Sequence, residues 1–133
     1  MSVSGAGKVL VVDDEPQNVM LLQDLLEARG YQVLTAGDGQ DALVLASEHY
    51  PDVVLLDVMM PRLSGFDVCL RLKAEPSTAM IPVLLVTALD AREDRLAGID
   101  AGASDFISKP IDSADLILRV RNAVATKRLH DQV

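Results

Sequence analysis

Residues 8–16 read KVLVVDDEP, and this stretch sets a pattern that the rest of the chain repeats. Residues 9–12 are four apolar side chains in a row, three of them β-branched, which is typical of a strand buried on both faces of a sheet. Asp13 and Asp14 follow directly, and Pro16 stands where the first turn of a helix tolerates proline. The stretch therefore predicts a strand, an acidic turn and a helix.

Short apolar runs alternate with segments of helical period along the remaining chain. We expect five strands, at residues 9–12, 32–36, 53–56, 83–86 and 105–108. We expect five helices, at residues 16–29, 41–49, 65–73, 93–101 and from a cap at Asp112 or Ser113 to about residue 130. This alternation predicts an α/β fold, with a parallel sheet covered by helices on both faces in a doubly wound topology.

Composition restricts the function. The chain has 133 residues, enough for one core, and 50% of them are hydrophobic. Aromatic residues make up only 3%, which argues against stacking on a flavin or on single-stranded nucleic acid. A net charge of −8 argues against direct nucleic-acid binding. Cys69 is the single cysteine, so we expect a buried, inert thiol and neither a disulfide nor a cysteine metal site.

The ends of the chain and its hydropathy suggest where it works. No apolar run approaches the roughly 20 residues of a membrane span, so we expect a cytoplasmic protein with no membrane contact. We expect residues 1–7 to be a disordered N-terminus, residues 8–125 the folded domain, and residues 126–133 a helical extension. The extension is polar and lacks a Gly or Pro terminator, which suggests a linker to a missing output domain. The alternative is the frayed end of a stand-alone domain.

Polar residues stand where the expected strands end. In doubly wound sheets, ligands bind at the carboxyl ends of the strands. These positions hold Asp13, Asp14, Asp57, Thr87 and Lys109. Any one of them alone could simply cap a helix or face solvent, but all five at strand ends indicate a shared cleft.

These residue types together indicate phosphoryl chemistry. Three carboxylates in one cleft repel one another and stay ionised most easily around a hard cation, and oxygen ligands suit Mg²⁺. Lys109 can neutralise a carboxylate or a phosphoryl oxygen, and the Thr87 hydroxyl can donate to the same group. A carboxylate nucleophile, a metal, a cation and a hydroxyl are what phosphoryl transfer to a protein requires.

Four ordered motifs resemble the receiver domain of bacterial two-component response regulators. They are VVDDE at residues 11–15, LLDVMMP at 55–61 with Gly65, VTA at 86–88, and Lys109-Pro110. The resemblance covers about residues 8–124. It implies a flavodoxin-like (βα)5 fold, with five parallel strands in the order 2-1-3-4-5.

The resemblance also implies a role for each residue of the cleft. Asp57 would accept a phosphoryl group from a sensor histidine kinase or a phosphotransfer protein. Asp14 and Asp57 would ligate Mg²⁺ directly, with the Met59 backbone carbonyl as a third ligand and Asp13 acting largely through water. Mn²⁺ would substitute for Mg²⁺. The protein would be a switch that catalyses only its own phosphorylation and slow dephosphorylation, not a classical enzyme.

The phosphoryl group would act on a two-state equilibrium. It brings about −1.5 to −2 charges, and Thr87 and Lys109 would reach it only if their loops move. Phe106 occupies the aromatic switch position of the family and would turn inward as Thr87 moves, with an ordinary buried Phe as the alternative. The Lys109–Pro110 bond would be cis, as in the family.

Two side chains bear on the lifetime of the phosphorylated state. Met59 lies two residues after Asp57, and Leu89 lies two after Thr87. Both would flank the path of an attacking water, and neither side chain can orient that water. We therefore expect the phosphoryl group to persist for longer than minutes.

The second half of the chain suggests partners. TALD at residues 87–90, AGASDF at 101–106 and RVR at 119–121 resemble receivers that head cyclic-di-GMP synthases or phosphodiesterases. In the family, the last two helices and the fifth strand form a homodimer surface. Ion pairs could form there through arginines at four positions: Arg92, Arg95, Arg119 and Arg121.

Two other classes of function fit the sequence less well. Aspartate-dependent phosphatases place a second Asp two residues after the acceptor, where this chain has Met59. A pure interaction module would carry the acidic site unused, and the intact set of five cleft residues argues against it. Phosphorylation-independent signalling through protein contacts remains the alternative to the phosphoacceptor function.

Overall fold

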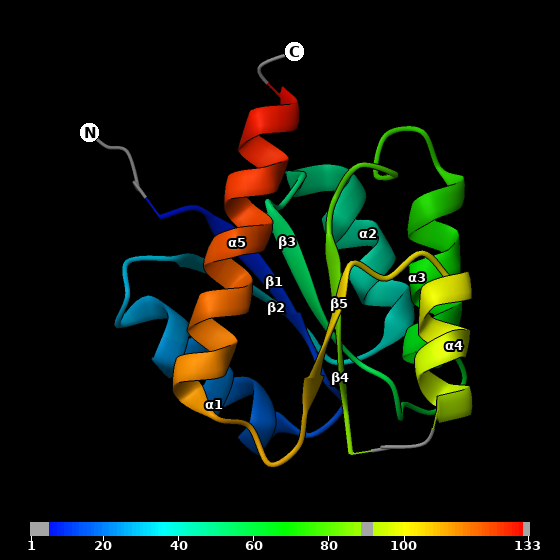
Figure 1. Ribbon diagram of the computed structural model, residues 1–133, viewed down its shortest axis with the longest axis horizontal. Helices are drawn as coiled ribbons and strands as arrows, with labels where there is room; N and C mark the ends of the chain where they lie inside the picture. The colour runs from blue at the N-terminus through cyan, green and yellow to red at the C-terminus, as the bar shows by residue number, and fades with distance from the viewer. Residues whose placement is uncertain (1–5, 89–91, 132–133) are drawn as a thin grey trace.

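The computed structural model describes residues 6–88 and 92–131. Strands and helices alternate along the chain (Figure 1). The strands are β1 (Lys8–Val12), β2 (Gln32–Ala36), β3 (Val53–Asp57), β4 (Val83–Thr87) and β5 (Asp105–Ser108). The helices are α1 (Pro16–Glu27), α2 (Gly39–His49), α3 (Gly65–Ala74), α4 (Arg92–Asp100) and α5 (Ser113–Asp131). All strand pairs are parallel, in the order β2-β1-β3-β4-β5, which confirms the predicted flavodoxin-like topology.

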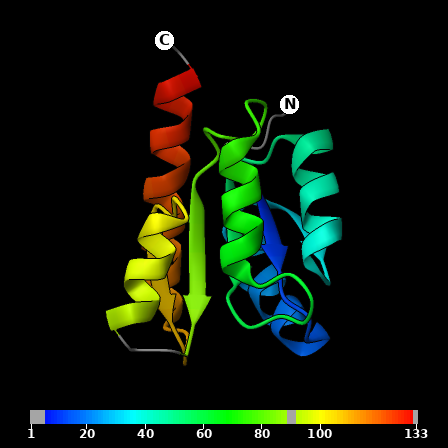
Figure 2. The same cartoon turned by 90° about the vertical axis from the view of Figure 1, so that its right-hand side faces the viewer.

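The sheet is a middle layer between two layers of helices (Figures 1 and 2). Alternate residues of a strand point to opposite faces, so Leu10 joins the core beneath α2, α3 and α4, while Val9 and Val11 join the core beneath α1 and α5. Each strand except β2 and β5 is almost wholly buried. Packing in the two cores fixes the position of each strand end, and the polar residues stand at these ends.

Local capping explains where the helices begin. Asp38 accepts a hydrogen bond from the Asp41 amide at 2.8 Å, so α2 starts two residues earlier than expected. Ser64 and Asp67 form a reciprocal capping box on α3. Asp112, one of the two candidates for the last helix, accepts from the Ala114 amide at 2.9 Å and is the cap.

The two ends of the described chain differ in how they are held. The Gly7 carbonyl accepts a hydrogen bond from the Gln32 amide at 2.9 Å, whereas residues 1–5 lie outside the described residues. α5 continues through Thr126 to Asp131 beyond the edge of the sheet (Figure 1). In the described part of the chain, no helix is long and apolar enough to cross a membrane.

Cys69 is a free, buried cysteine in α3, as predicted. Its thiol donates to the Ala101 carbonyl at 3.2 Å. Burial raises the pKa of Cys69 to about 11, so the reactive thiolate is scarce at neutral pH.

Candidate functional site

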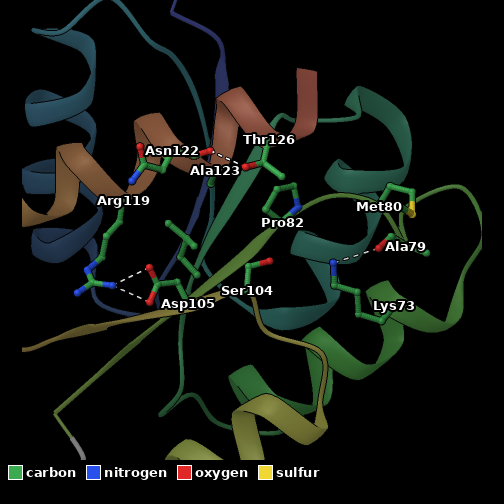
Figure 3. A pocket seen from close by; sticks show the side chains of 11 residues that line it. Lys73, Ala79, Met80, Pro82, Ser104, Asp105, Arg119, Asn122, Ala123 and Thr126 are labelled. Carbon is green, nitrogen blue, oxygen red and sulfur yellow. Dashed lines mark hydrogen bonds and ion pairs between the residues drawn. The ribbon is translucent and has the colours of Figure 1, made fainter. Parts of the chain in front are cut away.

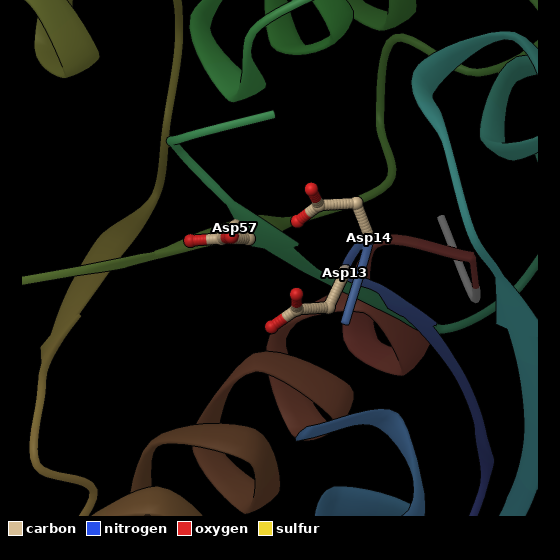
Figure 4. A group of neighbouring side chains, drawn as sticks. All are labelled: Asp13, Asp14 and Asp57. Carbon is tan, nitrogen blue, oxygen red and sulfur yellow. The ribbon is translucent and has the colours of Figure 1, made fainter. Parts of the chain in front are cut away.

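Three aspartates converge at the carboxyl edge of the sheet (Figure 4). Asp13 and Asp14 follow β1, and Asp57 ends β3. β1 and β3 are parallel neighbours with Val12 opposite Leu56, so the residues that follow lie side by side. One carboxylate oxygen from each aspartate lies within 4.8 Å of the others. The site predicted from the strand ends is therefore one cluster.

The three carboxylates differ in how deeply they are buried. Asp13 and Asp57 are 3% and 5% exposed, whereas Asp14 is exposed to solvent. Asp13 accepts a hydrogen bond from the Glu15 amide at 2.9 Å, which fixes its orientation. An all-oxygen cluster of this size fits Mg²⁺, which takes one or two carboxylates and retains several waters.

Asp57 is held in an environment that opposes its own charge. Burial, followed by the negative charge of Asp13, raises the pKa of Asp57 above its ordinary value. Lys109, whose Nζ donates to Asp57 Oδ1 at 3.2 Å, and the Met59 backbone amide pull this pKa back down. A cation placed among the three aspartates would stabilise the ionised form further.

Thr87 and Lys109 complete the cleft from the neighbouring strands. Thr87 ends β4, is 6% exposed and lies opposite Ser108 of β5. The Lys109 amide donates to the Thr87 carbonyl at 2.9 Å, which ties the two loops together. The bond between Lys109 and Pro110 is cis. All five predicted cleft residues thus occupy one edge of the sheet.

Gly65 has a structural role that the sequence pattern alone did not explain. A Cβ at this position would stand 2.4 Å from the Asp57 carbonyl oxygen and 2.8 Å from Val58 Cα. The Gly65 amide donates to the Val58 carbonyl at 2.9 Å. Only glycine lets the start of α3 approach the backbone of the acceptor residue this closely. The signal was present in the sequence as the glycine that accompanies the LLDVMMP motif.

Phe106 packs beneath α4. A Cβ on Gly98 would meet the Phe106 ring at 2.5 Å, and the Arg95 guanidinium lies 5.8 Å from the ring centroid. The half-buried ring therefore fills a space that a glycine leaves for it. Movement of Phe106 with Thr87 stays a prediction. Leu89, expected beside the path of attacking water, lies outside the described residues.

Two of the arginines expected on the surface of α4, β5 and α5, Arg119 and Arg121, lie on different sides of α5. Arg119 pairs within the chain with Asp105, at 2.6 Å (Figure 3). It also pairs with Asp115, at 3.0 Å. Arg121 does not share that face and instead lines a cavity with Arg29 and Tyr31. Residues two apart on a helix point in different directions, so placing Arg119 and Arg121 together was wrong.

Comparison with known proteins agrees with this geometry. Residues 9–121 match the family model of the response regulator receiver domain, and the chain belongs to that family. It is 50% identical to the response regulator PleD of Caulobacter vibrioides over 128 residues, which are 96% of this chain and 28% of PleD. It is 44% identical to the alkaline phosphatase synthesis transcriptional regulatory protein PhoP of Bacillus subtilis, over 86% of this chain and 47% of PhoP.

Solved structures give the same result. A response regulator receiver domain protein of Clostridium thermocellum aligns with a TM-score of 0.85 at 32% identity, over 92% of this chain and 97% of its own. The receiver domain of the sensor histidine kinase PA1611 of Pseudomonas aeruginosa aligns with a TM-score of 0.84 at 26% identity, over 91% and 99% of the two chains. That structure has a magnesium ion coordinated in its active-site cleft.

Proposed function

We propose that this chain is a phosphoacceptor switch in which Asp57 takes a phosphoryl group from a phosphohistidine of a sensor histidine kinase or a phosphotransfer protein. One observation carries the proposal. The Asp57 carboxylate, 5% exposed, lies within 4.8 Å of two further carboxylates and is hydrogen-bonded to Lys109 at 3.2 Å. A buried carboxylate between an acidic cluster and a lysine is equipped to attack phosphorus beside a metal.

The residues divide the work of transfer. Asp57 attacks the phosphorus, the P–N bond to the donor histidine breaks, and its electron pair leaves with the imidazole. Asp14, Asp57 and the Met59 carbonyl would hold Mg²⁺, with Asp13 acting through water; Mn²⁺ would substitute. When bound, the ion neutralises carboxylate and phosphoryl oxygens, so that the anionic donor can approach.

Thr87 and Lys109 respond to the product. Lys109 already contacts Asp57, and after transfer its ammonium would move to a phosphoryl oxygen. Thr87, which ends β4, would donate its hydroxyl to another. Phe106 would follow Thr87 and change the surface made by α4, β5 and α5. That surface would control a homodimer or a covalently linked output domain, of the cyclic-di-GMP type that residues 87–121 resemble.

The chain spans 28% of PleD and 47% of PhoP, so the output is proposed and not assigned. From the composition of the chain, we propose that it meets the kinase in the cytoplasm. The alternative is a receiver that uses this surface only as a protein-interaction module, without phosphorylation.

Intact mass after incubation with phosphoramidate separates the two functions. Phosphoramidate carries the same P–N bond as phosphohistidine. We expect the mass of one phosphoryl group to be gained with Mg²⁺, and no gain when EDTA replaces Mg²⁺. Asp57→Asn should gain nothing, whereas Asp24→Asn, an equal charge change on the exposed side of α1, should behave as wild type. A folded, Mg²⁺-loaded protein with no gain would favour the interaction module.

A further inference from the structure

A cavity lies at the end of the sheet where the strands begin, opposite to the end that carries Asp57. It has a volume of about 500 Å³ and lies between α5 and the segment that joins α1 to β2. Ala6, which precedes β1, and Tyr31, which precedes β2, mark the edge where the strands begin. Nothing in the phosphoacceptor function uses this cavity.

Three arginines line the cavity in a chain whose net charge is −8. Arg29 follows α1, and Arg121 and Arg128 stand seven residues apart on one side of α5. The lining residues include no Asp or Glu among the described residues. Asp52 and the Arg128 guanidinium both lie against Gly7, so Asp52 partly compensates Arg128. Arg29 and Arg121 therefore supply the positive charge on which a ligand would depend.

Tyr31 lines the cavity together with the three arginines. Its side chain is 8% exposed, and burial raises the pKa of its hydroxyl. The charges of Arg121, Arg128 and Arg29 act in the opposite direction and lower that pKa. All three guanidinium groups thus act on one hydroxyl, which can itself donate to an anion.

We propose that this cavity binds a small phosphate-bearing molecule of about the size of a nucleoside monophosphate. Guanidinium groups bind phosphate through paired N–H donors, and Arg29 and Arg121 approach from different elements. The volume lies within the ~300–1,000 Å³ typical of ligand pockets. Ile117, Val124 and the Tyr31 ring offer apolar contact to the part of the ligand that bears no charge.

Such a ligand would join α5 to the end of α1. The cavity is lined by α5 from Ile117 to Arg128, and this helix runs on to Asp131. Bound phosphate would therefore restrain the direction in which α5 leaves the sheet. Its ligand would not compete with a phosphoryl group on Asp57, because the cavity lies where the strands begin and Asp57 lies where β3 ends.

A nuclear magnetic resonance titration of the full ¹⁵N-labelled chain with adenosine 5′-monophosphate tests the proposal. Mg²⁺ is omitted, so that the aspartate cluster does not recruit phosphate. We expect saturable shifts of the amides of residues 29–32 and 117–128 and of the Arg29 and Arg121 side chains. Inorganic phosphate should compete more weakly because it lacks the apolar part.

Matched variants give the test its sharpness. Arg29 and Arg121 are exposed, so Arg29→Gln/Arg121→Gln should keep the fold while weakening binding at least about tenfold. Each single variant should also bind more weakly, whereas Arg71→Gln, a single change of the same kind on the exposed side of α3, should bind as wild type. Equal binding by the double variant, shifts that never saturate, or shifts confined to the Asp57 cleft would overturn the proposal. Saturable binding of adenosine, which has no phosphate, with the same affinity would also overturn it. So would saturable binding of a glutamate-rich peptide if no phosphate compound bound.

Discussion

The carboxylate of Asp57 is 5% exposed and lies beside Asp13. The position of this single residue affects the stability of the fold. Its pKa is raised above the ordinary value, chiefly by burial. An acid with a raised folded-state pKa favours folding in its protonated form and loses that advantage as pH rises through the folded pKa. The ionised carboxylate therefore destabilises the fold, and a cation bound beside it would reduce this cost.

Asp57→Asn should consequently stabilise the metal-free protein. We expect its Tm to exceed that of wild type by a few degrees at neutral pH in EDTA, because burial and the repulsion by Asp13 no longer act on a charge. The difference should shrink near pH ~3, where Asp57 is protonated in the folded and the unfolded chain. It should also shrink in Mg²⁺, which stabilises only wild type. Thermal denaturation followed by circular dichroism measures this, and a less stable variant in EDTA at neutral pH would contradict it.

Met59 bears on the lifetime of the phosphoryl group. Its side chain is 65% exposed beside Asp57 and offers no hydrogen bond to an attacking water. We expect the purified phosphoprotein to persist for longer than minutes in Mg²⁺. Met59→Asn, which can orient water, should shorten this several-fold, while Met59→Leu should leave it unchanged. Loss of the phosphoryl group from wild type within seconds, followed by intact mass, would show that the prediction is wrong.

At the scale of the element, the start of α3 is pressed onto the end of β3. Gly65→Ala should destabilise the fold by about 1–3 kcal/mol and weaken Mg²⁺ binding, because its Cβ would stand 2.4 Å from the Asp57 carbonyl oxygen. Gly37→Ala is the matched control near the same cleft, since its Cβ would meet nothing within 4 Å. Urea unfolding and a Mg²⁺ titration measure the two effects. Equal stability of the two variants would contradict this account of the contact.

The elements also show how far the sequence reaches. The strands at 32–36 and 105–108 have the predicted bounds, because apolar runs and turn residues are local signals. β3 and β4 each extend one residue further than predicted, so Asp57 and Thr87 lie at the strand ends themselves. The start of α2 differs from the prediction because its cap depends on a hydrogen bond that the Asp38 carboxylate accepts from the Asp41 amide.

The sequence could not predict the distances between side chains of distant segments. The five cleft residues were found because parallel strands bring their ends together. The distance from Lys109 to Asp57 and the closeness of Gly65 to Asp57 depend on packing across elements. The cavity around Tyr31 joins residues that are far apart in sequence and carry no motif, so no local pattern indicated it.

At the scale of the whole molecule, α4 and α5 present apolar side chains that nothing in the described chain covers. Ile99 of α4 and Leu118 of α5 are 59% and 46% exposed. If phosphorylation brings two copies together through this surface, beryllium fluoride with Mg²⁺ should raise the mass found by sedimentation. Ile99→Asp should prevent that change, whereas Leu70→Asp, at a 51% exposed position of α3, should not. Dimers formed equally by both variants would place the interface elsewhere.

The position of the phosphoryl group in the chain decides whether Asp57 is the nucleophile. Borohydride reduces an aspartyl phosphate to homoserine, which peptide mass spectrometry locates in the chain. After treatment with phosphoramidate and Mg²⁺, we predict homoserine at position 57 alone, and none in EDTA. Homoserine at position 13 or 14 would contradict the assignment of the nucleophile. Its absence from a folded, Mg²⁺-loaded protein would contradict the phosphoacceptor function itself.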